Sequence, residues 1–495
     1  MQQDRQLSQF QSPEGLFQLA REVVLDKTNR RCNLVFVTNK IGSTVASSLN
    51  GSATSTGSLG DELPPPARYI ELPVADDKSS TSGFSFAASL HTASSKGSEK
   101  KAKKSEKKLS KPAPVVAKIV AHENLAKILA NRAFETTFML LNVGTRVLWA
   151  EYPGTRLSEA LSYISFKDAI ATCIDVNMLN NDNIETVVGF NTGEILVYSP
   201  ISGKQTRFNK QGGMHKCAVT CVRWLPPRGQ PDDENLFVAG FEDGSLIHFD
   251  KEKEKEDSAP QHTPVFPKQS PLFMVATKQG KGKTNPVTWW KAGKKPITAI
   301  AISPDFTHLA IAGQDGYLRI VHYASEILVE TFRSFYGGIT CVDWSPDGKY
   351  LLTGSQDDNV TIWHFGHRGI VARCYAHSSW VSGVAFDPYL CTTSSYRFAS
   401  VGDDARLFLW EFSLELLTRP KPGKHRHRES PFLEAEEGVH PVLSRNDVST
   451  LAPLESAGFR LHKGPICALT FLEDALVTTD MTGLIKIWNR PPSSV

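Results

Sequence analysis

The sequence lacks any long apolar run. None of its 495 residues starts a stretch of roughly 18 consecutive apolar residues, the length that a membrane-spanning helix requires. The first residues, MQQDRQLSQFQSPEG, are polar and lack the apolar core of a secretory signal. We therefore expect no membrane as a partner and predict a location in the cytoplasm, the nucleus or both.

Cysteine is also scarce, with eight in the chain, and no two pairs stand at the spacing of a zinc site. Cys217 and Cys221, with His215 close by, are the group that most suggests a metal. We interpret both cysteines as core residues, because a free cysteine in an apolar run behaves as a small hydrophobe. The sequence therefore predicts no metal site, no disulfide framework and no cofactor.

Neither sign of charge is in large excess. Lys and Arg number 55 and Asp and Glu number 52, which gives a net charge of +3 and does not favour nucleic acid as the partner. The positive charge is concentrated at residues 96–111, KGSEKKAKKSEKKLSK. We interpret residues 76–113 as a disordered basic linker. The alternative that this run allows is a nuclear, chromatin-associated adaptor.

Signatures of catalysis are missing too. No Gly-rich strand-to-helix element carries the Lys of a phosphate-binding loop, and no nucleophile stands in a pattern with a base or metal ligands. We therefore predict that the protein is not an enzyme.

What the chain does have is a repeat. Residues 335–365 read FYGGITCVDWSPDGKYLLTGSQDDNVTIWHF, and residues 376–412 follow the same plan around a short insertion. Each copy has an alternating apolar strand, a turn, a strand of small residues, then Asp and, six positions later, Trp: Asp357 with Trp363, and Asp404 with Trp410. A period in the forties with this Asp-to-Trp spacing is typical of a WD-repeat β-propeller.

The same spacing recurs along much of the chain. Its other occurrences run Thr192 to Tyr198, Asp243 to Phe249, Asp315 to Val321 and Thr482 to Trp488. Residues 138–152 read as a further strand, turn and strand, so we predict an all-β propeller of seven blades. An N-terminal strand should complete the last sheet, because an open ring would leave sheet edges unpaired.

This pattern divides the chain into parts. We expect an N-terminal segment with the closing strand at 1–75, the basic linker at 76–113, and the propeller at 114–490. Within the propeller, residues 250–285 and 414–460 lack a sustained apolar period, and we expect loops there.

The repeated polar residues have structural roles in such a fold. Asp in the turn accepts hydrogen bonds, a His before the first strand reaches it, and Trp packs between blades while donating to the same network. We therefore interpret these residues as determinants of the fold and not as an acid–base site. They are His377, Ser400, Asp404 and Trp410 in one unit, and Asp243, Asp315, Asp357, Trp363 and Trp488 in the others.

Several longer motifs go beyond the general repeat: NPVTWW, AIAGQDGYLRI, SFYGGITCVDWSPDGKYLLTGSQDDNVTIW, HSSWVSGVAFDP and YRFASVGDDARLFLW. In these motifs the chain resembles a WD-repeat family of ubiquitin-specific-protease activators, the fungal catabolite-repression WD-repeat protein and its animal counterparts. The likeness covers residues 116–412 and returns at 461–490. It implies a non-catalytic scaffold that binds and activates a ubiquitin-specific protease and so regulates deubiquitination. A second WD-repeat protein takes part in some members.

The resemblance also implies where the partner binds. Family contacts to the protease lie in loops that lead into first strands, and by motif they fall on Tyr336 and Trp380. The animal members have Tyr-Phe where this chain has Phe335 and Tyr336, which leaves open which of the two reaches the partner. Independently, exposed aromatic residues in neighbouring loops are typical interface anchors. The alternative is a structural role for both: Phe335 sits where the network His usually stands, and a Trp just before a first strand, as Trp380 is, often packs against its own blade.

Overall fold

The computed structural model describes the sheets of the chain and most of the loops that join them. The basic linker at 76–113 lies outside the described residues. Within the described part, no helix has the length and apolar character needed to span a membrane. The described residues are 8–24, 34–38, 69–72, 115–130, 137–152, 160–180, 183–225, 235–253, 272–276, 284–367, 369–419 and 439–491.

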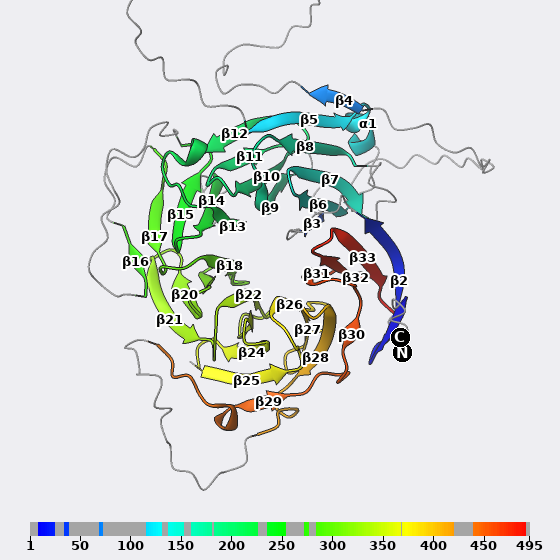
Figure 1. Cartoon of the computed structure of the whole chain (residues 1–495), viewed down its shortest axis with the longest axis vertical. Coiled ribbons are helices and arrows are strands. Elements are labelled where there is room, and N and C mark those ends of the chain that lie inside the picture. The colour runs from blue at the N-terminus through cyan, green and yellow to red at the C-terminus, as the bar shows by residue number, and fades with distance from the viewer. Residues whose placement is uncertain are drawn as a thin grey trace, which may run out of the picture.

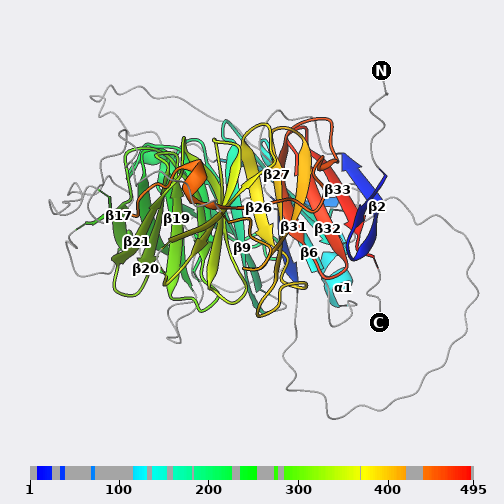
Figure 2. The ribbon, with the colours of Figure 1, turned by 90° about the horizontal axis from the view of Figure 1, so that it is seen from below.

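Seven sheets follow one another around a ring (Figure 1), and we call each sheet a blade. In the edge-on view the strands run between the two faces of the ring (Figure 2). This arrangement confirms the predicted all-β, seven-bladed propeller.

In the first four blades the strands are named here in their spatial order, from the ring centre outward. Blade 1 contains β3 (Leu34–Thr38), β6 (Thr137–Val143), β7 (Arg146–Tyr152), β8 (Ser162–Phe166), β5 (Val116–His122) and β4 (Tyr69–Leu72), with helix α1 (Leu125–Ala130) after β5. Blade 2 contains β9 (Ala171–Asn180), β10 (Asn183–Phe190), β11 (Ile195–Tyr198) and β12 (Gln205–Phe208). Blade 3 contains β13 (Val219–Trp224), β14 (Leu236–Phe241), β15 (Ser245–Asp250), β17 (Thr288–Lys291) and β16 (Met274–Val275). Blade 4 contains β18 (Ile297–Ile302), β19 (His308–Gly313), β20 (Tyr317–His322) and β21 (Ile327–Arg333).

The remaining three blades complete the ring in the same order. Blade 5 contains β22 (Ile339–Trp344), β23 (Tyr350–Ser355), β24 (Asn359–His364), β25 (Gly369–Tyr375) and β29 (Ser449–Leu451). Blade 6 contains β26 (Val381–Phe386), β27 (Tyr396–Gly402), β28 (Arg406–Phe412) and β30 (Phe459–Arg460). Blade 7 contains β31 (Ile466–Phe471), β32 (Ala475–Asp480), β33 (Leu484–Asn489), β2 (Gly15–Val24) and β1 (Gln9–Ser12).

Glycines in the small-residue strands let neighbouring blades approach closely. A Cβ on Gly189 would lie 2.5 Å from Cγ1 of Val219, and a Cβ on Gly354 would lie 2.5 Å from Cγ1 of Val381. In both cases the valine begins the inner strand of the next blade. Because interiors are close-packed, any larger side chain at these glycines would force two blades apart.

The two insertions differ from our expectation of loops. Residues 250–285 contribute β16 to the outer edge of blade 3, and residues 414–460 contribute β29 and β30 to the outer edges of blades 5 and 6. The physical reason is that an outer strand exposes a row of unpaired backbone groups, which even a two- or three-residue strand can satisfy.

The N-terminal segment closes the ring, as predicted. Strand β2 pairs antiparallel with β33, so that the first and last described segments lie side by side (Figure 1). Lys486 Nζ is 2.9 Å from a Glu22 carboxylate oxygen, and Arg397 Nη1 is 3.1 Å from a Glu14 carboxylate oxygen. These ion pairs bind β2 and its hairpin to blades 7 and 6.

Closure generates a stability prediction. Phe17 in β2 is buried, its ring stacks 4.8 Å from that of Phe10, and both belong to the core cluster of Trp488. Phe17→Ala should lower the free energy of unfolding by about 3 to 5 kcal/mol, because it opens a cavity at the closing sheet. Urea unfolding followed by tryptophan fluorescence measures the loss. Val24→Ala, at a side chain 66% exposed in the same strand, is the control, and an equal effect of both changes would contradict the prediction.

Candidate partner-binding surface

Two neighbouring loops present aromatic side chains on one face of the ring. Residues 334–338 join β21 to β22, and residues 376–380 join β25 to β26. Because strands within a blade alternate in direction, all loops that connect one blade to the next lie on the same face, which we call the upper face. Strands β22 and β26 pack side by side, and Thr340 Oγ1 donates to the carbonyl of Val381. The two loops are therefore adjacent.

The first loop is held tightly from within. Ser334 Oγ donates to the carbonyl of Gly337 at 2.7 Å, and the N–H of Gly338 donates to Oε1 of Gln356 at 2.9 Å. Gly337 has φ +68°, a conformation that suits glycine, and a Cβ on Gly338 would lie 2.9 Å from Cα of Gln314. The two glycines of FYGG thus let the loop turn sharply against the preceding blade.

This loop directs its two aromatic side chains differently. Tyr336 is 76% exposed, while its N–H donates to Oδ2 of Asp357 at 3.2 Å. Phe335 is 47% exposed, and the guanidinium of Arg373 lies 4.6 Å from the centre of its ring. Tyr336 therefore presents its ring to solvent from an anchored backbone, whereas Phe335 rests partly on its own blade.

The second loop begins at a buried hydrogen-bond network. His377 Nδ1 lies 3.0 Å from a carboxylate oxygen of Asp404, and His377 Nε2 lies 2.8 Å from Ser400 Oγ. Trp410 Nε1 donates to the same Ser400 oxygen at 2.9 Å. With the imidazole proton on Nδ1, Ser400 donates to His377 and accepts from Trp410, so every member has a partner.

The carboxylate of Asp404 fixes the loop that carries Trp380. Burial by itself would raise the pKa of Asp404, but the hydrogen bond and charge of His377 and the N–H groups of Ser378 and Arg406 together lower it. The N–H of Asp403 donates to the carbonyl of Trp380 at 2.9 Å. Trp380 is 49% exposed, so a fixed backbone holds a large apolar side chain at the surface.

The other predicted aspartates occupy the equivalent turn with different partners. Asp243 is 3.1 Å from His215 Nε2 and 2.6 Å from Lys291 Nζ. Asp315 is 2.6 Å from Arg319 Nη2. Burial raises the pKa of Asp357, against the lowering effects of the N–H groups of Asn359 and Tyr336 and of the Arg373 charge.

Two of the predicted tryptophans donate hydrogen bonds to the neighbouring strand of the same blade. In the last blade the acid of the network stands two positions earlier in the sequence than the spacing predicted. Trp363 Nε1 donates to Thr353 Oγ1 at 2.8 Å, and Trp488 Nε1 donates to Thr478 Oγ1 at 3.1 Å. In blade 7 Asp480, two positions before Thr482 in the expected spacing, lies 3.0 Å from His462 Nδ1. Sequence reasoning missed Asp480, although an acid next to the turn was the available signal.

The cysteine that suggested a metal does lie in a cluster of possible ligands. One ligand atom each from His215, Cys217 and Asp243 lies within 4.8 Å of the other two. The Asp243 carboxylate is already paired with Lys291 Nζ, and burial raises the pKa of the Cys217 thiol. A lysine charge at the acid and a protonated thiol both oppose cation binding.

Comparison with known proteins agrees with this architecture. The family model described as WD domain, G-beta repeat (WD40), matches residues 285–322 and 327–364. The UBP9-binding protein bun62 of Schizosaccharomyces pombe is 29% identical over 415 residues, which cover 76% of this chain and 75% of that protein. Seven blades, the matched repeats and two buried networks of His, Asp, Trp and a Ser or Thr hydroxyl define a WD40-repeat propeller. The chain carries WD repeats in a seven-bladed propeller and is similar to this UBP9-binding protein, in keeping with the family resemblance of its motifs.

The buried network generates a second prediction. Ser400→Ala should leave His377 Nε2 and Trp410 Nε1 without a partner in the core, and it should cost roughly 1 to 3 kcal/mol of stability. Thermal and urea unfolding measure the loss. Ser378→Ala is the control, because only the backbone N–H of Ser378 bonds to Asp404. If the two variants lose the same stability, the network does not have the role described.

Proposed function

We propose that this protein is a non-catalytic scaffold that binds a ubiquitin-specific protease through the upper face of its propeller and raises the activity of that protease. The observation that carries the proposal is the pair of exposed aromatic side chains, Tyr336 and Trp380, on adjacent anchored loops. A relative named as a UBP9-binding protein supports a protease of the ubiquitin-specific class as the partner.

The geometry supports Tyr336 and Trp380 as the principal contacts, with Phe335 beside them. Interface anchors are commonly aromatic, and a fixed backbone reduces the entropy lost on binding. Phe335 is already engaged with Arg373, so in this proposal it supports the surface more than it contacts the partner.

Activation in this proposal is a shift of population. A scaffold that binds the active arrangement of the protease more tightly than the inactive one raises turnover without supplying a catalytic group. The buried polar residues of the propeller agree with this division, since His377, Ser400 and Asp404 are bonded to one another and to Trp410. Whether a second WD-repeat protein joins the complex remains a prediction from the resemblance, as do the cytoplasmic or nuclear location and the adaptor role of residues 76–113.

The aromatic contacts are testable by substitution. Trp380→Ala should weaken protease binding by about 2 kcal/mol or more, and Tyr336→Ala should weaken it in the same direction, as expected of hot-spot residues. Isothermal titration calorimetry with a purified ubiquitin-specific protease measures both. Phe306→Ala is the matched control, because Phe306 is a 56% exposed aromatic residue in a turn on the opposite face. Unchanged binding by both folded variants would remove the site assignment.

Activation is tested separately from binding. The purified chain alone should release no fluorophore from a ubiquitin-based substrate, and its addition to the protease should increase kcat. Trp380→Ala should shift the concentration of chain needed for activation and leave the maximal kcat unchanged at saturation. Hydrolysis by the chain alone, or binding without any change in turnover, would contradict the proposed role.

A further inference from the structure

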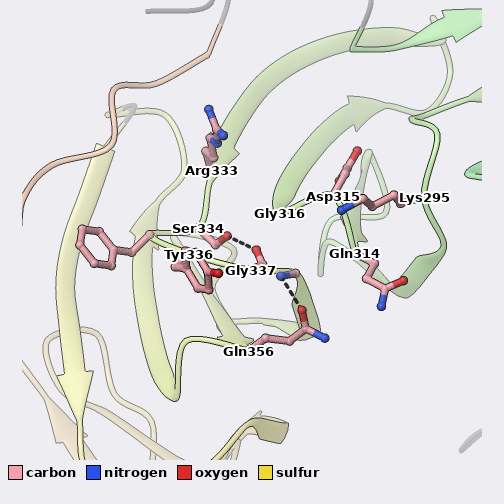
Figure 3. Close-up of a pocket in the computed structure, with 11 residues that line it drawn as sticks. Lys295, Gln314, Asp315, Gly316, Arg333, Ser334, Tyr336, Gly337 and Gln356 are labelled. Carbon is pink, nitrogen blue, oxygen red and sulfur yellow. Dashed lines mark hydrogen bonds between the residues drawn. The ribbon is translucent and has the colours of Figure 1, made fainter. Parts of the chain in front are cut away.

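A pocket of about 880 Å³ opens on the upper face beside Tyr336. It lies between blade 4 and the FYGG loop, and Figure 3 shows Lys295 and Gln314 across the hollow from Tyr336 and Gln356. A pocket of this size holds several side chains of a partner and not merely one. Its position next to a proposed contact residue makes it part of the same surface.

The charges that line this pocket are unbalanced. Lys295 is exposed and forms no ion pair among the described residues, and the guanidinium of Arg333 lies 5.4 Å from the ring centre of Tyr317 without a carboxylate partner in the described part of the chain. Asp315 is the one acid among the described lining residues, and Arg319 already pairs with it at 2.6 Å. The pocket therefore carries two uncompensated positive charges.

A third cation lies behind the pocket wall. Arg373 is only 1% exposed, and its Nε and Nη1 atoms have no hydrogen-bond partner within the described structure. Its guanidinium stacks on Phe335, which lines the pocket. Its charge also favours the ionised form of the nearby Asp357 carboxylate, so Arg373 is partly offset by that acid and is not a third uncompensated charge of the pocket.

Neutral donors complete the lining. Gln356 uses Oε1 to accept the N–H of Gly338, which leaves its amide nitrogen as a donor, and Gln314 presents a second amide (Figure 3). Cations flanked by amide donors match the oxygens of a carboxylate, which only accept hydrogen bonds. The same lining would repel a basic side chain.

We propose that this pocket receives an acidic side chain, Asp or Glu, from the docking segment of the partner protein, with Lys295 and Arg333 as its charge partners. The inference rests on the proposed function and adds the chemistry of the partner's segment to it. Aromatic contacts at Tyr336 and Trp380 supply apolar burial, and the pocket supplies charge selection for an acidic surface over a basic one.

The first experiment measures protease binding by three folded variants at low and high salt. Lys295→Glu should weaken binding about tenfold or more by placing like charges together, and Arg333→Gln should weaken it less. Both should flatten the salt dependence of the wild-type affinity. Lys204→Glu makes the same charge change in an exposed turn on the opposite face and should leave affinity unchanged. If Lys295→Glu binds like Lys204→Glu, with circular dichroism showing a native fold for both, the proposal is overturned.

The second experiment separates this proposal from the proposed function. Fluorescently labelled hexaglutamate and hexaglutamine are titrated with the full chain at low salt. Binding of hexaglutamate alone, lost in Lys295→Glu and kept in Lys204→Glu, supports a pocket that receives acidic side chains even if no protease binds. Equal binding of both peptides, or hexaglutamate binding that Lys295→Glu leaves unchanged, overturns it. If the wild-type chain binds no protease, the proposed function fails and the peptide titration decides the pocket alone.

Discussion

The pairing of β2 with β33 is the constraint on which the rest of the propeller depends. Each blade buries its faces against two neighbours, and blade 7, which packs against blade 1, is complete only when β2 from the start of the chain joins its sheet. The side chain of Lys486 is fully buried at this joint and pairs with Glu22 of β2. A buried ammonium requires its acid, and a strand shifted by one residue would turn that acid to the other face. The ion pair therefore favours both the pairing of β2 with β33 and the register of that pairing.

The exposed aromatic side chains of the upper face are explained by one difference between the loops of blades 5 and 6. In blade 6 the N–H of Ser378 and the imidazole of His377 both reach Asp404. In the preceding loop Tyr336 supplies the same backbone N–H to the equivalent acid, Asp357, but Phe335 stands in the histidine position. The backbone hydrogen bond to the acid is thus present in both loops, but the loop of Tyr336 has no imidazole beside it. The buried Arg373 supplies positive charge near Asp357 instead and carries the Phe335 ring. The exposed aromatic loop is found where a phenylalanine occupies the position that His377 has in the next blade, and its backbone is still anchored to the acid.

The features that could be predicted from the sequence are those that repeat. The alternating strands, the spacing from Asp404 to Trp410 and the need for a closing strand follow from local pattern and from edge pairing, and they gave the seven blades. The strands β16, β29 and β30 could not be predicted, because segments this short pair only where a distant blade offers a free edge. The pocket was missed for a related reason. Lys295 lies in the connection from blade 3 to blade 4, Arg333 ends β21, and Phe335 lies in the loop that follows β21. Only the packing of blade 4 against the loop of residues 334–338 brings them to one hollow.

Polar side chains in the buried network and at the pocket differ in where their hydrogen bonds go. His377, Ser400 and Asp404 have the composition of a catalytic triad, yet the Ser400 hydroxyl accepts from Trp410, is bonded to His377 and is fully buried, so no substrate can reach it. These side chains form their hydrogen bonds with one another, and this network stiffens the loop that begins at His377. By contrast, the donors of Lys295 and the ring of Tyr336 have no such internal partners within the described structure and face solvent at the rim of the pocket. The backbone of these loops is held by internal hydrogen bonds, while the exposed side chains are not. Such a surface loses little entropy on binding. The propeller presents a fixed shape and charge, which is the property that the proposed scaffold role requires.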